Sequence, residues 1–162
     1  MAKISADEVT SMLQKTGCSC LNEQQSYPHR NLFNGGGEVL PLRSDCDPEL
    51  LLQLNFMQTI SMNSMIIGLP ETDSCPKTIK LFCNRQNMGF EDAKEINPVQ
   101  QIDIELGTTS LKIDLIASKW NRTDTITLFI EDNHGNDVTE IHSLRLFGKA
   151  LMSTDVSQIK KC

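Results

Sequence analysis

From residue 50 onward, apolar and polar side chains alternate along the sequence with a period of two. Leu52 and Leu54 alternate with Gln53 and Asn55, which is typical of strands with one buried face. The same pattern recurs between turn residues and predicts strands at residues 50–56, 58–68, 77–84, 102–106, 111–115, 125–130 and 139–148. About eight such strands with very little helix favour an all-β fold, a jelly-roll antiparallel β-sandwich.

The ends of the chain lack this alternation. Residues 5–16 are predicted to form a short N-terminal helix, because Val9, Met12 and Leu13 share one helical face. Residues 19–37 are predicted to form an irregular loop, which is rich in Asn and Gly. One further helical turn is expected at residues 91–94. The domains are an N-terminal helical segment (1–16), a β-sandwich domain (17–148) and a mobile C-terminal tail (149–162).

The length of 162 residues suits one domain with its own hydrophobic core, which needs no disulfide to fold. The N-terminus lacks the apolar stretch of a signal peptide, and no apolar run is long enough to cross a membrane. We therefore expect a monomeric cytoplasmic protein, with the nucleus as an alternative location, whose six cysteines stay reduced.

Charge argues against two classes of partner. The formal net charge is -6, so the surface repels phosphate groups unless a local basic patch overrides it, and Lys160 with Lys161 is too small a patch. A single Trp and a single Tyr leave few platforms on which bases could stack. Nucleic acids and membranes are therefore not expected as partners.

The sequence lacks the common catalytic motifs. Gly35-Gly36-Gly37 is not followed by Gly-Lys-Ser or Gly-Lys-Thr, so a flexible turn is favoured over a phosphate-binding loop. There is no Gly-x-Ser-x-Gly nucleophile elbow and no His-Glu-x-x-His helix. The only histidines are His29, His134 and His142. We expect neither enzymatic activity nor a cofactor.

One set of residues could bind zinc. Cys18 and Cys20 are separated by one residue, and His29 and Cys46 could complete a tetrahedral site. The gap between cysteines is usually two to four residues in zinc modules. Buried or unreactive thiols are therefore favoured, and no metal site is expected.

A stretch with Asp45, Asp47 and Glu49 superficially resembles a calcium loop. Leu50 stands where that loop needs glycine, and Phe56 stands where it needs glutamate. A turn in which Ser44 or Asp45 bonds nearby backbone amides, with Pro48 fixing the entry into the strand, is therefore favoured.

Other candidate contact residues lie in expected loops. An acidic cluster is interpreted as a solvated hairpin tip, with a contact surface as the alternative, and it comprises Glu131, Asp132 and Asp137. Four aromatic residues either cover an end of the sandwich or anchor a partner if solvent reaches them, and these are Phe33, Phe90, Trp120 and Phe147. Of these, Trp120 is retained as a candidate partner contact.

Several segments, taken in order, resemble one known family. They are residues 17–23, 42–51, 76–82, 88–93, 126–130, 133, 139–141 and 146–148. Their order and spacing resemble the PITH domain, which is the C-terminal domain of a proteasome-interacting thioredoxin-like protein and also occurs without a thioredoxin domain. The resemblance runs from Gly17 to Gly148 and so covers most of the chain.

The resemblance implies a jelly-roll sandwich similar to galactose-binding domains, which agrees with the strand count. It also implies association with the regulatory particle of the 26S proteasome, and it implies no catalytic residues. The expected function is therefore that of a non-catalytic protein-interaction module. The alternative is a small-ligand or carbohydrate-binding domain, for which Trp120 and Tyr27 are the strongest aromatic candidates.

The C-terminal tail is a candidate partner contact, because it is too polar to pack a core. Val156 and Ile159 are three residues apart and would form one apolar face if the tail orders on binding. Lys160 and Lys161 would then meet acidic groups of the partner. The alternative is a terminus with no role in binding.

Overall fold

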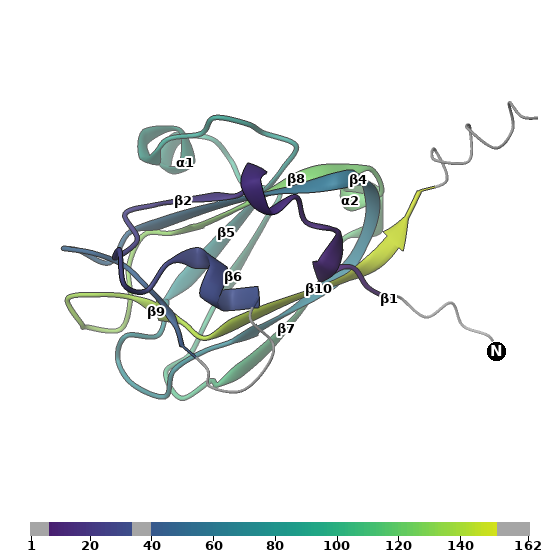
Figure 1. The fold of residues 1–162 in the computed structure, drawn as a ribbon. Coiled ribbons are helices and arrows are strands. Elements are labelled where there is room, and N and C mark those ends of the chain that lie inside the picture. The colour runs from purple at the N-terminus through teal and green to yellow at the C-terminus, as the bar shows by residue number, and fades with distance from the viewer. Residues whose placement is uncertain (1–6, 34–39, 152–162) are drawn as a thin grey trace, which may run out of the picture.

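The computed structural model describes residues 7–33 and 40–151, which form antiparallel strands with a few short helical turns (Figure 1). The strands are β1 (Asp7–Glu8), β2 (Ser19–Leu21), β3 (Leu42–Arg43), β4 (Leu50–Gly68), β5 (Thr78–Cys83), β6 (Gln100–Asp103), β7 (Ser110–Asp114), β8 (Thr123–Ile130), β9 (Glu140–Ile141) and β10 (Ser143–Ala150). The helical turns are the 3₁₀ turns η1 (Thr10–Met12), η2 (Lys15–Gly17) and η3 (His29–Phe33) and the α-helices α1 (Phe90–Glu95) and α2 (Ala117–Trp120).

The long strand β4 belongs to both layers of the sandwich. Its first half, up to Asn55, pairs with β2 and β8, and its second half, from Ile60, pairs with β10 and β7. The register with β8 shifts between Asn55 and Ile60, and irregularities of this kind bend a strand. One layer therefore has the order β2-β4-β8-β5-β6, and the other has the order β1-β10-β4-β7. The two strands predicted at 50–56 and 58–68 are one bent strand.

The main hydrophobic core lies between the two layers. Every second residue at the start of β4 points into it, as the alternation predicts. Facing residues of the other strands complete the core, including Leu128 and Ile130 of β8, Ile79 and Leu81 of β5, and Leu144 and Leu146 of β10. The expected all-β sandwich is therefore confirmed.

A second hydrophobic cluster lies on the outer face of the β4-β8-β5 layer. Leu51, Phe82 and Phe129 point outward from these strands and are buried together with Ala93 of α1. The ring of Phe129 lies 6.1 Å from that of Phe90, centroid to centroid. Helix α1 thus covers this face, and it confirms the helical turn expected at residues 91–94.

The prediction of an N-terminal helix over residues 5–16 is wrong for residues 7–16, which the structure describes. Residues 7–17 form β1 and the turns η1 and η2 instead. The segment has short internal turns and is also bonded to the sandwich, because Val9 N donates to Leu146 O at 2.7 Å and Gln14 N donates to Asn55 O at 2.8 Å. Val9 is buried in the main core, so the described part of the segment belongs to the sandwich.

Other element boundaries also differ from the expectation. The predicted loop at 19–37 contains β2 and η3, and the last predicted strand is divided into β9 and β10. Strand β9 pairs with β3 in a separate two-stranded ribbon. Strand β10 ends at Ala150, so the tail boundary at 149 is wrong by two residues.

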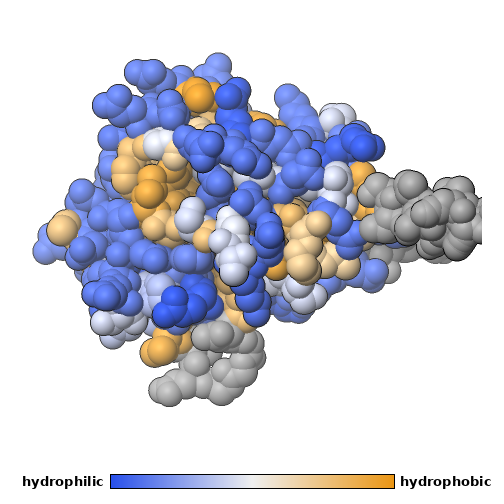
Figure 2. Space-filling view, turned by 45° about the horizontal axis from the view of Figure 1, so that its top comes forward, coloured by the Kyte–Doolittle hydropathy of each residue, from blue (hydrophilic) through white to orange (hydrophobic). Residues whose placement is uncertain are grey.

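Hydrophilic residues predominate on the face shown in Figure 2, where apolar residues form separate patches. The exposed large apolar side chains come from different parts of the chain, and they are Leu21, Leu40, Met57, Leu106 and Ile116. Within residues 7–33 and 40–151, no helix is long and apolar enough to cross a membrane.

Candidate functional site at the loop end

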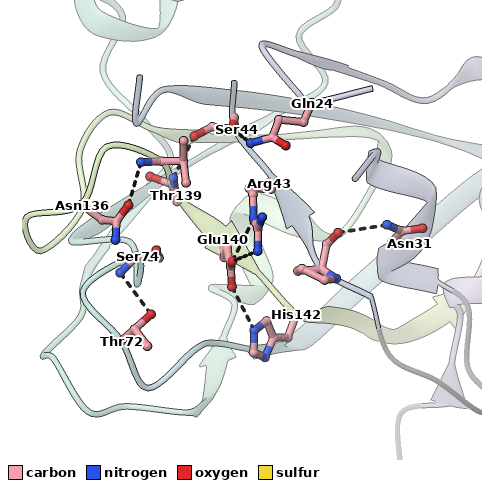
Figure 3. Close-up of polar contacts among 12 residues, drawn as sticks. Gln24, Asn31, Arg43, Ser44, Thr72, Ser74, Asn136, Thr139, Glu140 and His142 are labelled. Atoms are coloured by element: carbon pink, nitrogen blue, oxygen red, sulfur yellow. Dashed lines mark hydrogen bonds and ion pairs between the residues drawn. The ribbon is translucent and has the colours of Figure 1, made fainter. Parts of the chain in front are cut away.

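One end of the sandwich, called the loop end below, is built from residues 22–28, 43–49, 69–77 and 131–142. Backbone bonds join these segments, because Ser44 N donates to Thr139 O at 2.9 Å and Glu140 N donates to Ser74 O at 3.0 Å. Figure 3 shows that the polar side chains of the loop end converge around the β3-β9 ribbon.

Asn22 connects the first two segments of the loop end. Its backbone has a φ of 70°, a conformation that Asn tolerates better than most residues. Its Nδ2 lies within hydrogen-bonding distance of Glu49 O (2.8 Å) and of Asp47 Oδ1 (2.9 Å). Asp47 Oδ1 also accepts a bond from Glu49 N at 3.1 Å. Asp45 Oδ1 accepts from Cys46 N at 3.1 Å, which confirms the predicted turn with a side-chain bond to a nearby backbone amide.

Ser44, Thr139 and Asn133 form a buried chain of hydrogen bonds. Ser44 Oγ accepts from Thr139 N at 2.8 Å, and Thr139 Oγ1 donates to Pro48 O at 2.8 Å. Asn133 Nδ2 donates to Thr139 Oγ1 at 3.0 Å. Ser44 and Thr139 are fully buried, and bonded groups of this kind hold the backbone rather than meet a ligand. The polar residues that carried the family resemblance thus hold the loop end in shape.

A partly exposed cluster on the β3-β9 ribbon surrounds Arg43. Arg43 Nε donates to Glu140 Oε2 at 2.9 Å, and the other carboxylate oxygen lies 3.4 Å from His142 Nε2 (Figure 3). The Arg43 guanidinium carbon lies 4.4 Å from the centroid of the Tyr27 ring. Sequence reasoning missed this cluster, because Arg43 and Glu140 are 97 residues apart.

A cavity of about 480 Å³ adjoins the loop end on the outer face of β5 and β8. Its lining includes Lys77, Lys80, Glu49, Glu131 and Asp132. Lys80 Nζ lies 5.9 Å from the ring centroid of Phe129, which is buried at the cavity floor. The structure thus brings two members of the predicted acidic cluster together with Glu49, next to two lysines.

The histidine contacts show no activated nucleophile. His29 Nδ1 contacts Glu23 Oε1 at 2.9 Å, and His134 Nε2 contacts Ile104 O at 2.9 Å. His142 Nε2 lies 3.4 Å from Glu140 Oε1. Across the described ranges, no histidine contacts the side chain of a serine, threonine or cysteine, which is the pairing that nucleophilic catalysis uses.

Cys18, Cys20, His29 and Cys46, the candidate zinc ligands, do not form a metal-binding cluster in the described structure. In the part of the chain that the structure describes, no three His, Cys, Asp or Glu side chains lie close enough together to hold a metal ion. Burial raises the pKa of Cys18, and burial together with the nearby Glu23 carboxylate raises the pKa of Cys20. Both groups are therefore protonated thiols at neutral pH.

The prediction that Trp120 contacts a partner is wrong, because its side chain is not at the surface. The residue ends α2, and its side chain is fully buried in the main core. Its Nε1 donates to Gln100 Oε1 at 3.0 Å, and the same oxygen accepts from Ile116 N at 2.9 Å. The indole therefore has its polar partner inside the protein. The other proposed contacts lie outside the described residues, and they are Val156, Ile159, Lys160 and Lys161.

Curated proteins similar to this chain include thioredoxin-like protein 1 of Schizosaccharomyces pombe, which is 30% identical over 174 residues. That alignment covers 99% of this chain and 60% of the relative. PITH domain-containing protein 1 of Homo sapiens is 27% identical over 135 residues, covering 80% of this chain and 64% of the relative. The chain thus spans less than two thirds of these relatives.

Solved structures with a similar fold include sugar-binding domains. One is a family 32 carbohydrate-binding module of C. perfringens NanJ in complex with galactose, with a TM-score of 0.67, 12% identity and coverage of 89% of this chain and 99% of the module. Another is a fucolectin from the serum of striped bass, Morone saxatilis, with a TM-score of 0.64, 10% identity and coverage of 91% and 50%. At these identities the likeness concerns the fold.

The sequence model of the PITH domain family matches residues 2–162. This range is wider than residues 17–148, over which the separate segments show the resemblance. The N-terminal segment lies within this match, in agreement with the burial of Val9 in the core. This chain therefore belongs to the PITH domain family.

Proposed function

We propose that this chain is a non-catalytic protein-binding domain that associates with the regulatory particle of the 26S proteasome. The observation that carries the proposal is the match to the PITH domain over residues 2–162, together with the similarity to a thioredoxin-like protein over nearly the whole chain. The family resemblance in the sequence implies this partner.

The hydrogen bonds of the polar residues at the loop end support a binding role. Asn22, Ser44 and Thr139 lie in the segments that carry the resemblance, and each is bonded within the loop end. No contact of these side chains resembles a nucleophile with its base. The domain thus offers a rigid surface on which a partner can dock.

A capture experiment tests this function. The tagged chain is incubated with cell lysate at physiological salt, and bound proteasome subunits are quantified by mass spectrometry. We expect enrichment of regulatory-particle subunits over an unrelated acidic β-sandwich of similar net charge. Purified 26S proteasome and isolated 20S core are then compared in direct binding. Enrichment no greater than for the control domain, or equal binding to the 20S core, would contradict the proposal.

Carbohydrate binding is the second candidate function, because domains of the same fold have been solved with sugars, galactose among them. The aromatic platforms expected for it are restricted, since Trp120 is fully buried and the Arg43 guanidinium lies over one face of the half-buried Tyr27 ring. Titration of the ¹⁵N-labelled chain with galactose and fucose decides between the two functions. Saturable amide shifts at the loop end would favour sugar binding.

A further inference from the structure

The N-terminal turns and η3 enclose a groove on one side of the sandwich, called the N-terminal groove below. Two adjoining cavities of about 290 and 380 Å³ share Thr10, Lys15 and Phe33 in their linings and so form one groove. The first cavity is also lined by Leu13, Cys18, His29 and Arg30. In Figure 1 these elements, coloured purple to blue, lie in front of the strands.

The floor of the N-terminal groove is an apolar extension of the main core. Leu13 is buried within that core, and the partly buried side chains of Cys18 and Phe33 pack against it. Burial raises the pKa of Cys18, so this thiol is uncharged at neutral pH. Cys18 Sγ also lies 3.4 Å from Gln14 O. Because the floor is anchored in the core, it forms a preformed site for an apolar side chain.

The rim of the N-terminal groove is cationic on a chain whose formal net charge is -6. Lys15 and Arg30 are exposed, and no described carboxylate forms an ion pair with either. The second cavity is also lined by Glu8, and both this acid and Glu23, the ion-pair partner of the lining residue His29, already have partners. Glu23 contacts His29 at 2.9 Å, and Glu8 contacts Arg145 Nη2 at 3.0 Å.

We propose that the N-terminal groove binds a peptide segment of a partner protein in which a large apolar side chain is flanked by acidic side chains. The apolar side chain fills the cavity over Leu13 and Phe33, and the carboxylates meet Lys15 and Arg30. Charge complementarity selects the partner, since this local positive potential attracts acidic segments to a protein that is negative overall. The inference rests on the proposed protein-binding function and names the chemistry of one contact.

The test titrates the ¹⁵N-labelled chain with a blocked hexapeptide, Glu-Glu-Leu-Phe-Glu-Glu. We expect saturable shifts of the amide signals of Thr10, Lys15, Cys18, Arg30 and Phe33, weakening as salt is raised. A peptide with Ser-Ser in place of Leu-Phe, and one with lysine in place of each glutamate, should each bind at least about tenfold more weakly, which corresponds to about 1.4 kcal/mol.

Charge reversal at the rim provides the matched variants. Lys15→Glu with Arg30→Glu should weaken peptide binding at least about tenfold. The control is Lys119→Glu with Arg85→Glu, which changes the same residue types at exposed positions outside both groove cavities. The control should bind like the original chain, and both variants should keep its melting temperature.

Several outcomes would overturn the inference. These are no saturable shift at the groove, equal binding by the rim variant and the original chain, or equal binding of the lysine peptide. Self-association of the chain that is lost in the rim variant, without peptide binding, would assign the groove to a second copy. Tighter binding of a single-stranded oligonucleotide than of the peptide would assign it to nucleic acid.

The same variants separate this inference from the proposed function. If the original chain captures the regulatory particle and the rim variant captures as much, the groove inference fails and the proposed function stands. If the chain binds the peptide in the groove but captures no regulatory particle, the proteasome proposal fails and the groove assignment stands.

Discussion

Leu51 and Leu52 are consecutive residues of β4 and lie in two different hydrophobic clusters. Leu52 points into the main core between the layers, whereas Leu51 points outward into the cluster under α1. A strand buried on both faces shows a continuous apolar run instead of alternation, as Leu50-Leu51-Leu52 does. This layer therefore has two independent packing interfaces, which mutations can separate.

The first prediction concerns the main core. Leu128→Ala or Ile130→Ala should lower the free energy of unfolding by about 2–5 kcal/mol, because each leaves a cavity among buried neighbours. Urea denaturation at constant pH measures the change. Lys112→Ala, at an exposed position, is the control and should change stability by less than about 0.5 kcal/mol. Losses below about 1 kcal/mol at both core positions would contradict the assignment of the inward face.

The second prediction concerns the outer cluster. Phe129→Ala should lower stability by about 3–5 kcal/mol and should loosen α1, because the Phe129 ring packs against Phe90. Hydrogen exchange resolved along the chain measures both effects. Ile130→Ala is the matched control, since its side chain lies on the opposite face. Equal acceleration of exchange in α1 for the two variants would refute the separation of the clusters.

The third prediction uses Trp120, the single tryptophan of the chain. In the native protein its fluorescence emission maximum should lie at a shorter wavelength than in the unfolded chain, and iodide should quench the emission weakly, because the indole is fully buried. Gln100→Leu removes the acceptor for Trp120 Nε1 and Ile116 N, and it should lower stability by about 1–3 kcal/mol. Gln101→Leu, at the exposed neighbouring position, should leave both readouts nearly unchanged.

The fourth prediction concerns the cysteines, of which the described ones are all free: Cys18, Cys20, Cys46, Cys75 and Cys83. Among these described cysteines, the exposed Cys46 should react first with iodoacetamide in the native protein. Cys20 should react slowly, because burial raises its pKa and delays formation of the thiolate. Peptide mapping by mass spectrometry measures each rate, and equal rates at Cys46 and Cys20 would contradict this order.

The raised pKa of Cys20 also sets a direction for the pH dependence of stability. A raised pKa in the folded state means that folding favours the neutral thiol. The contribution of Cys20 to the free energy of unfolding is therefore complete below the unfolded-state pKa of about 8.5 and falls as the pH rises above that value. Cys20→Ala should make the loss of stability between about pH 8.5 and 10 smaller.

A disulfide in freshly purified, air-protected protein would contradict the expectation of free thiols.

The fifth prediction concerns the tail. Deletion of residues 152–162 should leave the melting temperature unchanged, because β10, the last strand that the structure describes, ends at Ala150. Capture of the regulatory particle should fall, since the deletion removes the candidate contacts Val156, Ile159, Lys160 and Lys161. Replacing the segment with a Gly-Ser linker of equal length is the control for chain length. Undiminished capture would place the contact on the sandwich itself.

Strands were predictable where aliphatic residues recur at every second position. The strand predicted at 111–115 is β7 at 110–114, and the one predicted at 125–130 is the end of β8. The start of β8 was missed, because Thr123 is polar yet fully buried and donates to Trp120 O at 2.9 Å. Periodicity treats such a residue as exposed, since it has no information about internal partners.

The N-terminal segment shows a different limit of sequence reasoning. The apolar spacing of Val9 and Leu13 correctly indicated that both are buried. The same spacing predicted the wrong backbone conformation, an α-helix. Carbonyl oxygens of β10 and β4 accept hydrogen bonds from amides of this segment, in place of acceptors within a helix. The contacts of the loop end were equally hidden, since Arg43 and Glu140 meet only after the whole sandwich has formed.

The pairing of β1 with β10 sets Asp7 opposite Gly148, so the described sandwich begins and ends at the same edge (Figure 1). A polypeptide fused before residue 7 and one fused after residue 150 would be tethered to neighbouring points, leaving the loop end unobstructed. The same closeness makes the domain suited to circular permutation. A short linker between the two ends, with new termini opened at the exposed turn around Gly107, should preserve both layers.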